Sequence, residues 1–462
     1  MERLTSFWQD FRFAIRGIKK DRGFALVAIF ALALGIGATT VIFSVIENVL
    51  IEPFPYRDAD RLAVMQIHDL TKPTDYDSSF YTLPQFLDIR EQNHVFDDVL
   101  GVSPLDVLYQ DKEGTQQFTG ASVTANAFEF LGMKPLLGRN IVPDDGKPGA
   151  TPVFSMSYRL WKKEFNSDPR PVGTTLVLNG EARTLVGVMP PRFLLWNADM
   201  WVPLVLNRSD AASNQTYLWT IGRLKPGVSM PQAVSDFEVI AKRLAKQYPT
   251  GYPTKFSVVA KTLADSVVGH FKTTLYTLLA AVSMLLLIAC SNVANLLLAR
   301  ATAREKEIAI RASMGASRLR LVRQLLVESF VLAAGGCLLG CLFAYGGLKG
   351  VTAAMPPETI PAEAMLQLNV SAMLFAVGIT FLTTILCGLA PAIHVVRGDL
   401  HGRLKDTGKG VNASFRHGKF RSGLVVSEVA LSIVLLVGAG LMMRSLFALQ
   451  HVELGLNPVN IL

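Results

Sequence analysis

Long runs without a charged residue constrain this chain more than any other feature. The hydrocarbon core of a bilayer is about 30 Å thick, so a helix needs roughly 20 apolar residues to cross it. Four runs reach that length with no charge, and a fifth, Leu424–Leu441, includes Glu428. The first run is too long for the core of a cleaved signal peptide, about 7–15 residues, and no clear A-x-A site follows it. We therefore predict retained membrane helices at 24–50, 273–299, 321–351, 372–396 and 422–449.

The distribution of charge gives these helices an orientation. Segments 1–23, 300–324 and 397–421 hold 20 of the 45 Lys and Arg residues but 7 of the 37 Asp and Glu residues. The loop 352–371 has no Lys or Arg. Short loops rich in Lys and Arg stay in the cytoplasm, so the N-terminus is expected inside and 51–272 outside. Because the basic residues are divided among three membrane-edge segments, the sequence argues against a nucleic-acid partner.

The segments between the predicted helices then follow in a fixed order. In the first of them Phe7, Trp8, Phe11, Ile15 and Ile18 share one helical face, which is typical of an interfacial amphipathic helix. The order is an amphipathic inner segment at 1–23, an outer domain at 51–272, a charged inner segment at 300–320, an outer loop at 352–371, an inner linker at 397–421 and the start of a second external segment at 450–462.

The segment 51–272 has the pattern of a mixed α/β domain. Asn179-Gly180 lies between two strand-forming runs, which predicts a hairpin because both turn positions need positive φ. Ser229–Tyr248 predicts a helix, with Ser229 and Gln232 forming a capping box. The fold class is therefore an α-helical transmembrane protein with a mixed α/β domain inserted between helices 1 and 2.

The sequence offers no catalytic, cofactor-binding or metal-binding residues. The seven histidines have no metal-ligand spacing, and no nucleophile–base motif is present. A phosphate-binding G-x-x-x-x-G-K-[ST] loop is also missing. The most similar stretch, "DTGKGVN", lacks the spacing of the first glycine and the hydroxyl after Lys409. We predict that the chain is not an enzyme and does not bind or hydrolyse ATP.

Several polar and small residues inside the spans favour helix packing. Asn292 and Asn295 near the end of the second span can hydrogen-bond across helices, and packing is a better interpretation than a polar transport path. Gly336 and Gly340 form a G-x-x-x-G pattern, which favours close contact between helices. Gly346 and Gly350 form another.

The charged stretch after the second span has helical spacing. Arg300, Arg304, Glu307, Arg311 and Arg318 recur on one face, Gly315 suits a left-handed stop, and Ser317 can cap the next helix. Such a helix could rest on anionic lipid or present a rigid face to a soluble partner. The pattern alone favours neither.

"NVANLLLARATAREKEIAIRASMGASRLRLVRQLLVES" resembles the signature of MacB/FtsX-like ABC transporter permeases. "GFALVAIFALALGIGATTVIFSVIENVLIEPFPYRDADRLAVM" and "GRLKPGVSMPQAVSDFEVIAKRLAKQYP" resemble the first span and the extracytoplasmic domain of that family. The resemblance is strongest to the duplicated permeases of Acidobacteria and covers essentially the whole chain. It implies a four-helix permease unit in the bacterial inner membrane with a MacB-like periplasmic domain at 51–272.

The resemblance also implies partners and a docking segment. ATP would be bound by a separate cytoplasmic ABC ATPase, whose work is passed to the periplasmic domain. The resemblance also implies that the chain lies in a lipid bilayer. Further implied partners are a second copy or second half of the permease and a periplasmic adaptor. The positions that would contact the ATPase are Arg304, Glu305, Glu307, Ile308, Arg311, Gly315 and Ser317.

The sequence departs from the duplicated family in one respect. "FRSGLVVSEVALSIVLLVGAGLMMRSL" resembles the first span of a second unit, whose continuation the 462 residues do not include. A truncation after the first unit is therefore expected. The leading hypothesis is a permease subunit for export or efflux. The alternatives are an FtsX-like regulator of a periplasmic cell-wall hydrolase and an inactive truncated copy.

Overall fold

The computed structural model describes residues 2–72, 77–110, 114–168, 170–208, 215–303, 318–354, 363, 366–397 and 414–450. The chain divides into two compact units. The helical unit comprises Met1–Ile46, Thr273–Ala354 and Leu366–Leu462. The second, which we call the inserted domain, comprises Glu47–Lys272 together with Met355–Met365. The short outer loop between the third and fourth spans is thus grouped with the domain that lies between the first and second spans.

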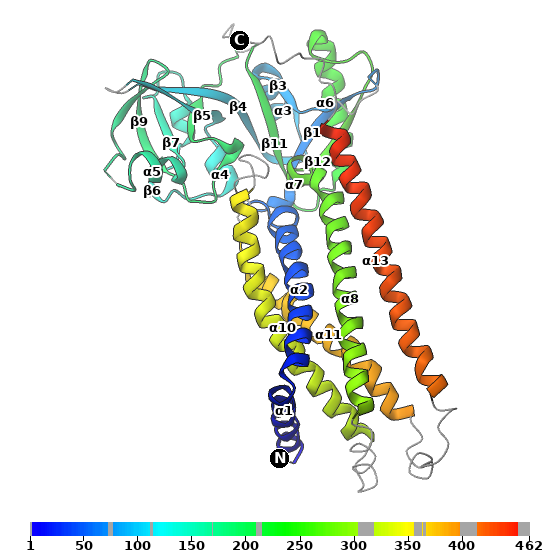
Figure 1. Cartoon of the computed structure of the whole chain (residues 1–462). Helices are drawn as coiled ribbons and strands as arrows, with labels where there is room; N and C mark the ends of the chain where they lie inside the picture. Colours follow the sequence, from blue (N-terminus) through cyan, green and yellow to red (C-terminus); the bar gives the residue numbers. More distant parts are fainter. Residues whose placement is uncertain are drawn as a thin grey trace, which may run out of the picture. The chain divides into compact units, whose positions relative to one another are not determined.

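Five helices among the described residues are long and apolar enough to cross a membrane, as predicted. Each extends beyond or shifts slightly from its predicted bounds, because helices continue past the hydrocarbon region. The N-terminal segment forms a separate helix, α1 (Glu2–Lys20). The five spanning helices are α2 (Arg22–Ile46), α8 (Lys272–Ala303), α10 (Arg318–Ala354), α11 (Val370–Arg397) and α13 (Ser414–Gln450), shown in Figure 1.

Helices α2 and α10 approach each other closely through glycines. A Cβ atom added to Gly340 would lie 2.9 Å from the Ala33 carbonyl oxygen and 3.0 Å from the Gly37 nitrogen. One added to Gly336 would lie 2.8 Å from the Leu32 Cβ. The approach at Gly340 is backbone to backbone, and a side chain at either glycine would push the helices apart. The first glycine pair of α10 therefore lies directly against α2.

The second glycine pair behaves differently from its prediction. Cβ atoms added at Gly346 and Gly350 would meet nothing within 4 Å. Both positions are exposed in the chain. The pattern G-x-x-x-G recurs on one helix, but only the pair that faces α2 makes a close contact among the described residues.

The inserted domain is built on one 12-stranded sheet with the main strand order β12-β1-β11-β4-β5-β10-β7-β9-β6. The strands are β1 (Leu62–Asp69), β2 (Asp77–Ser78), β3 (Phe80–Thr82), β4 (Phe96–Gln110), β5 (Thr115–Thr124), β6 (Leu137–Gly138), β7 (Val153–Met156), β8 (Thr175–Leu178), β9 (Glu181–Val188), β10 (Met200–Leu204), β11 (Tyr217–Leu224) and β12 (Phe256–Thr262). Most neighbours pair antiparallel, whereas β10 pairs parallel with β5 and β7 pairs parallel with β9.

Hydrophobic side chains form separate cores at the two ends of this sheet. At the β1–β11–β12 end, α3 (Leu83–Gln92) and α6 (Met230–Gln247) cover one face, while the other face packs on α4 (Ala127–Leu131) and α7 (Leu263–Val268). At the other end, α5 (Tyr158–Glu164) packs on β7 and β9. Figure 1 shows these helices beside their strands. Strand β1 is buried on both faces, since successive side chains enter different cores.

Two local predictions in this domain are confirmed. Asn179 and Gly180 have φ of 52° and 77° and connect β8 to β9, with Leu178 opposite Glu181. Helix α6 begins after Ser229, whose nitrogen donates to the Gln232 side chain at 2.8 Å. The capping box therefore forms as the sequence indicated, because both signals depend on neighbouring residues alone.

Candidate functional site

The seven positions implied to contact an ATPase lie outside the described residues. They are Arg304, Glu305, Glu307, Ile308, Arg311, Gly315 and Ser317. The structure does describe the helices on either side, where α8 ends at Ala303 and α10 begins at Arg318. These flanking ends define a candidate site.

One contact joins the start of α10 to the N-terminal helix. Arg323 donates from Nε to Oδ2 of Asp10 at 2.9 Å, and its Nη2 lies 2.8 Å from the same oxygen. Asp10 is 8% exposed, so the carboxylate is mostly withdrawn from water. Ala14, one turn further along α1, is buried as well. The side of α1 that carries Asp10 and Ala14 is therefore packed.

A second contact joins the C-terminal end of α8 to the C-terminal end of α1. Arg300 donates from Nη2 to the Gly17 carbonyl oxygen at 2.9 Å. Its guanidinium carbon lies 4.8 Å from the centre of the Phe24 ring, within the range of a cation–π contact. The Gly17 carbonyl belongs to the last turn of α1, where a cation is favourable to the helix dipole.

Together these residues form what we call the α1 cluster, consisting of Asp10, Gly17, Phe24, Arg300 and Arg323. Helix α1 holds the last turn of α8 and the first turns of α10 by charged contacts, on both sides of 304–317 in the sequence. Removing one partner of a largely buried ion pair leaves a charge without compensation, which is costly. The cluster can therefore hold the C-terminal end of α8 and the N-terminal end of α10 in place.

Sequence reasoning identified the apolar face of α1 but missed the role of Asp10. Trp8 is 59% exposed and remains available for a membrane interface, as an interfacial helix requires. The overlooked signal is an aspartate placed four residues before Ala14 in a helix otherwise rich in Lys and Arg. That spacing marks a second, packed face beside the interfacial one.

The predicted packing residues of α8 separate into two groups. Asn292 is exposed, whereas its neighbour Val293 is buried. One residue along a helix turns the side chain by about 100°, which explains the difference. Asn295 is half-buried, and its Oδ1 atom is buried without a hydrogen-bond partner in the described chain. Among the described residues, this oxygen therefore does not form the expected bond across helices.

The inserted domain contains a second feature that sequence reasoning missed. The Tyr56 hydroxyl donates to Oε1 of Glu363 at 2.9 Å, and Nε of Arg192 donates to the Glu363 carbonyl oxygen at 3.3 Å. Glu363 belongs to the loop between α10 and α11, and it is 4% exposed. Burial raises the pKa of this carboxyl, although Tyr56 and Arg192 act in the opposite direction. Glu363 is thereby attached to Tyr56 and Arg192 of the inserted domain.

No group of three or more His, Cys, Asp or Glu suited to a metal ion occurs in the part of the chain that the structure describes. The α1 cluster and the contacts of Glu363 are instead structural contacts between distant parts of the chain.

Two family models match the chain. A MacB-like periplasmic core domain matches residues 25–240, which include most of α2 and much of the inserted domain. An FtsX-like permease C-terminal domain matches residues 279–400, which include α10 and α11. The chain belongs to the MacB/FtsX-like ABC transporter permeases. The five long, apolar helices that the structure describes are those of a membrane protein.

Curated relatives resemble parts of the permease. It is 27% identical over 223 residues to the uncharacterized ABC transporter permease YknZ of Bacillus subtilis, covering 47% of this chain and 53% of YknZ. It is 26% identical over 225 residues to the macrolide export ATP-binding/permease protein MacB of Burkholderia thailandensis, covering 47% of this chain and 33% of MacB. The permease thus spans between a third and about half the length of these relatives.

Among solved structures, the periplasmic region of MacB from Actinobacillus actinomycetemcomitans aligns with 47% of the permease and 94% of that chain. The alignment has 14% sequence identity and a TM-score of 0.34.

Proposed function

We propose that this permease transmits ATP-driven motion from a separate cytoplasmic ATPase subunit to its inserted domain in the periplasm, in the service of export or efflux. The chain would lie in the bacterial inner membrane with its N-terminus in the cytoplasm. A second permease unit and a periplasmic adaptor would complete the assembly. ATP would be bound and hydrolysed on the partner alone.

The observation that carries this proposal is the α1 cluster. A segment that merely rests on lipid needs no fixed ends, because its apolar face and basic charges suffice to hold it. Here the helices before and after 304–317 are both attached to α1, through Arg300–Gly17 and Arg323–Asp10. Fixed flanks favour a segment that receives force from a partner.

Charge and the outer loop support the direction of transmission. Segments rich in Lys and Arg tend to stay in the cytoplasm, which supports a cytoplasmic position for the α1 cluster, on the side where an ATPase would be found. Glu363 fixes the loop between α10 and α11 to the inserted domain through Tyr56 and Arg192. Motion of these two helices would therefore reach the domain through this loop as well as through α2 and α8.

The test is a charge reversal inside the proposed docking segment, Glu307→Lys. A lipid-resting helix should tolerate it, because added positive charge favours anionic lipid by about 1 kcal/mol. A docking helix should lose its partner, since like charges in a complementary interface cost several kcal/mol, on the order of a hundredfold in affinity. The tagged chain is purified from its own membranes, and the co-purifying ABC ATPase is quantified by mass spectrometry through its nucleotide-binding sequence.

The matched control is Asp406→Lys, the same reversal in the predicted inner linker 397–421. We expect Glu307→Lys to insert normally but to lose the ATPase, while Asp406→Lys keeps it. Undiminished ATPase with Glu307→Lys would refute this docking surface. Recovery of a cell-wall hydrolase in place of an outer-membrane channel would replace export by FtsX-like regulation.

A further inference from the structure

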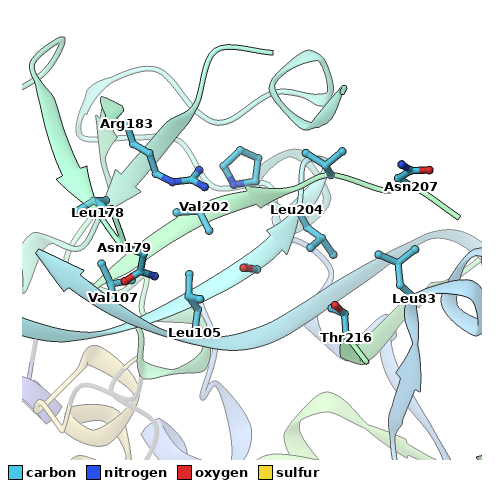
Figure 2. Close-up of a pocket in the computed structure, with 13 residues that line it drawn as sticks. Leu83, Leu105, Val107, Leu178, Asn179, Arg183, Val202, Leu204, Asn207 and Thr216 are labelled. Atoms are coloured by element: carbon cyan, nitrogen blue, oxygen red, sulfur yellow. The ribbon is translucent and has the colours of Figure 1, made fainter. Parts of the chain in front are cut away.

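A cavity of about 310 Å³ lies on the sheet of the inserted domain. Its walls come from β4, β5 and β10 and from the β8–β9 hairpin, with Leu83 of α3 at one end. Figure 2 shows Leu105 and Val107 on β4, and the Arg183 side chain extending from β9 toward β10. Cavities of roughly 300 Å³ and above are large enough for small organic ligands.

The floor of this cavity is apolar. Val107, Leu178 and Val202 are buried beneath it, and Leu105 and Leu204 are half-buried beside them. These side chains come from two strands, β4 and β10, and from the β8–β9 hairpin, so the apolar surface is held by the sheet and does not depend on one loop. A floor of this kind favours the hydrocarbon part of a ligand, because burial removes apolar surface from water.

The polar groups of the cavity differ in whether they can still form hydrogen bonds with a ligand. The Asn179 side chain is fully engaged, since its Oδ1 accepts from the Leu108 nitrogen at 2.7 Å and its Nδ2 donates to the Asp106 carbonyl at 3.0 Å. The Ser122 hydroxyl makes no hydrogen bond to the described residues. Arg183 is paired with Glu181, whose side chain is 50% exposed.

The ion pair between Arg183 and Glu181 is weak enough for a ligand anion to replace Glu181. Ion pairs at an exposed surface contribute little, because water competes for both partners. Arg183 is 21% exposed and extends over an apolar floor, where a ligand anion would be shielded from water. An anion bound there can replace Glu181 as the partner of the guanidinium, which suits carboxylate and sulfonate oxygens through its fork of N–H donors.

We propose that this cavity binds a small amphipathic anion, with its hydrocarbon body on the Leu105–Val107–Val202 floor and its acid group at Arg183 and Ser122. This site is independent of the proposed ATPase docking, so either can fail without the other. The mixed lining explains the choice of ligand class. A purely apolar molecule would make no use of the Ser122 hydroxyl or of the Arg183 guanidinium, and an amphipathic cation would be repelled by Arg183.

The experiment uses the full chain in lipid nanodiscs and octanesulfonate as the probe. A single cysteine is introduced as Leu204→Cys at the cavity edge, and its rate of modification by a membrane-impermeant thiol reagent is followed. The four native cysteines lie in spanning helices, and the unmodified chain gives their background. Ser235→Cys on the exposed side of α6 is the matched control, and octyltrimethylammonium is the matched cation.

Octanesulfonate is expected to slow labelling at position 204 in a saturable manner, with no effect at position 235 and no comparable protection by the cation. In the same background, Arg183→Gln should weaken protection about tenfold, as the loss of a hydrogen bond to a charged group does. Glu181→Gln should strengthen it, because the guanidinium no longer has a competing partner.

The opposite signs of these two substitutions keep the test decisive even if the hairpin is sensitive to change, because misfolding would abolish protection in both. Equal protection by the cation, absence of protection by octanesulfonate, or weakened protection with Glu181→Gln would each overturn the proposal.

Discussion

At the scale of single residues, Asp10 and Arg323 test whether α1 has a structural role beyond the membrane interface. Arg323→Ala leaves a carboxylate that is 8% exposed without its partner. We expect a loss of about 1–3 kcal/mol in unfolding free energy, less than for a fully buried pair because Arg323 is partly exposed. The measurement is chemical or thermal unfolding of the chain in detergent.

The control for this pair is Arg12→Ala on the exposed side of α1. It removes one positive charge from the same helix and is expected to change stability by less than 0.5 kcal/mol, as most exposed charges do. Adding Asp10→Asn to Arg323→Ala should recover part of the loss, because the buried charge is then removed as well. An equal effect of Arg12→Ala and Arg323→Ala would contradict the assignment.

Glu363 gives a prediction for pH dependence. Burial raises the pKa of its carboxyl above the value of 4.5 of a free glutamate. The folded state therefore holds the proton more tightly than the unfolded state, and the contribution of this group is fully present below pH 4.5. It is lost as pH rises through the folded pKa. Glu363→Gln, which mimics the protonated form, should remove this loss.

The measurement compares unfolding of wild type and Glu363→Gln between about pH 4 and 8. The variant should gain stability relative to wild type as the pH increases. Other carboxylates, such as Asp77 and Asp145, have lowered pKa values and titrate in both proteins, so they cancel in the difference. If the stability of both proteins changed with pH in the same way, the pKa of Glu363 would be the same in the folded and unfolded states, against the prediction.

At the scale of elements, the contact of α2 with α10 predicts opposite outcomes for two glycines on one helix. Gly340→Ala places a methyl group 2.9 Å from the Ala33 carbonyl, so the helices must move apart. A loss of about 1–3 kcal/mol is expected, as for other overpacked sites. Gly346→Ala meets open space and should be neutral or slightly stabilising, because Ala favours helix. Thermal unfolding of both variants decides whether this contact is specific.

The elements themselves were accessible from the sequence wherever the signal is local. Apolar runs predict the five spans, the Asn179-Gly180 turn predicts its hairpin, and Ser229 predicts the start of α6. The candidate site was not accessible in this way. Asp10 meets Arg323 across 313 positions, and Tyr56 meets Glu363 across 307. Such pairs depend on how helices and loops are packed, which periodicity does not encode.

At the scale of the whole molecule, the proposed topology predicts which residues a reagent outside the cell can reach. Ser235→Cys in the inserted domain should be labelled in intact cells by a membrane-impermeant thiol reagent, while Ser313→Cys in the charged segment should not. Both should be labelled once the membrane is permeabilised, which controls for access. Labelling of position 313 without position 235 would reverse the orientation inferred from the basic segments.

The glycine contact between α2 and α10 also imposes an order on biosynthesis. The partner surface of α2 around Ala33 and Gly37 is supplied by a helix that begins at Arg318. At synthesis rates of about 5–20 residues per second, α10 leaves the ribosome roughly 15–60 s after α2. Under the proposed topology, residues 47–272 of the inserted domain cross the membrane and begin to fold during that interval. Until α10 is made, the face of α2 around Ala33 and Gly37 lacks the helix that it packs against in the folded chain.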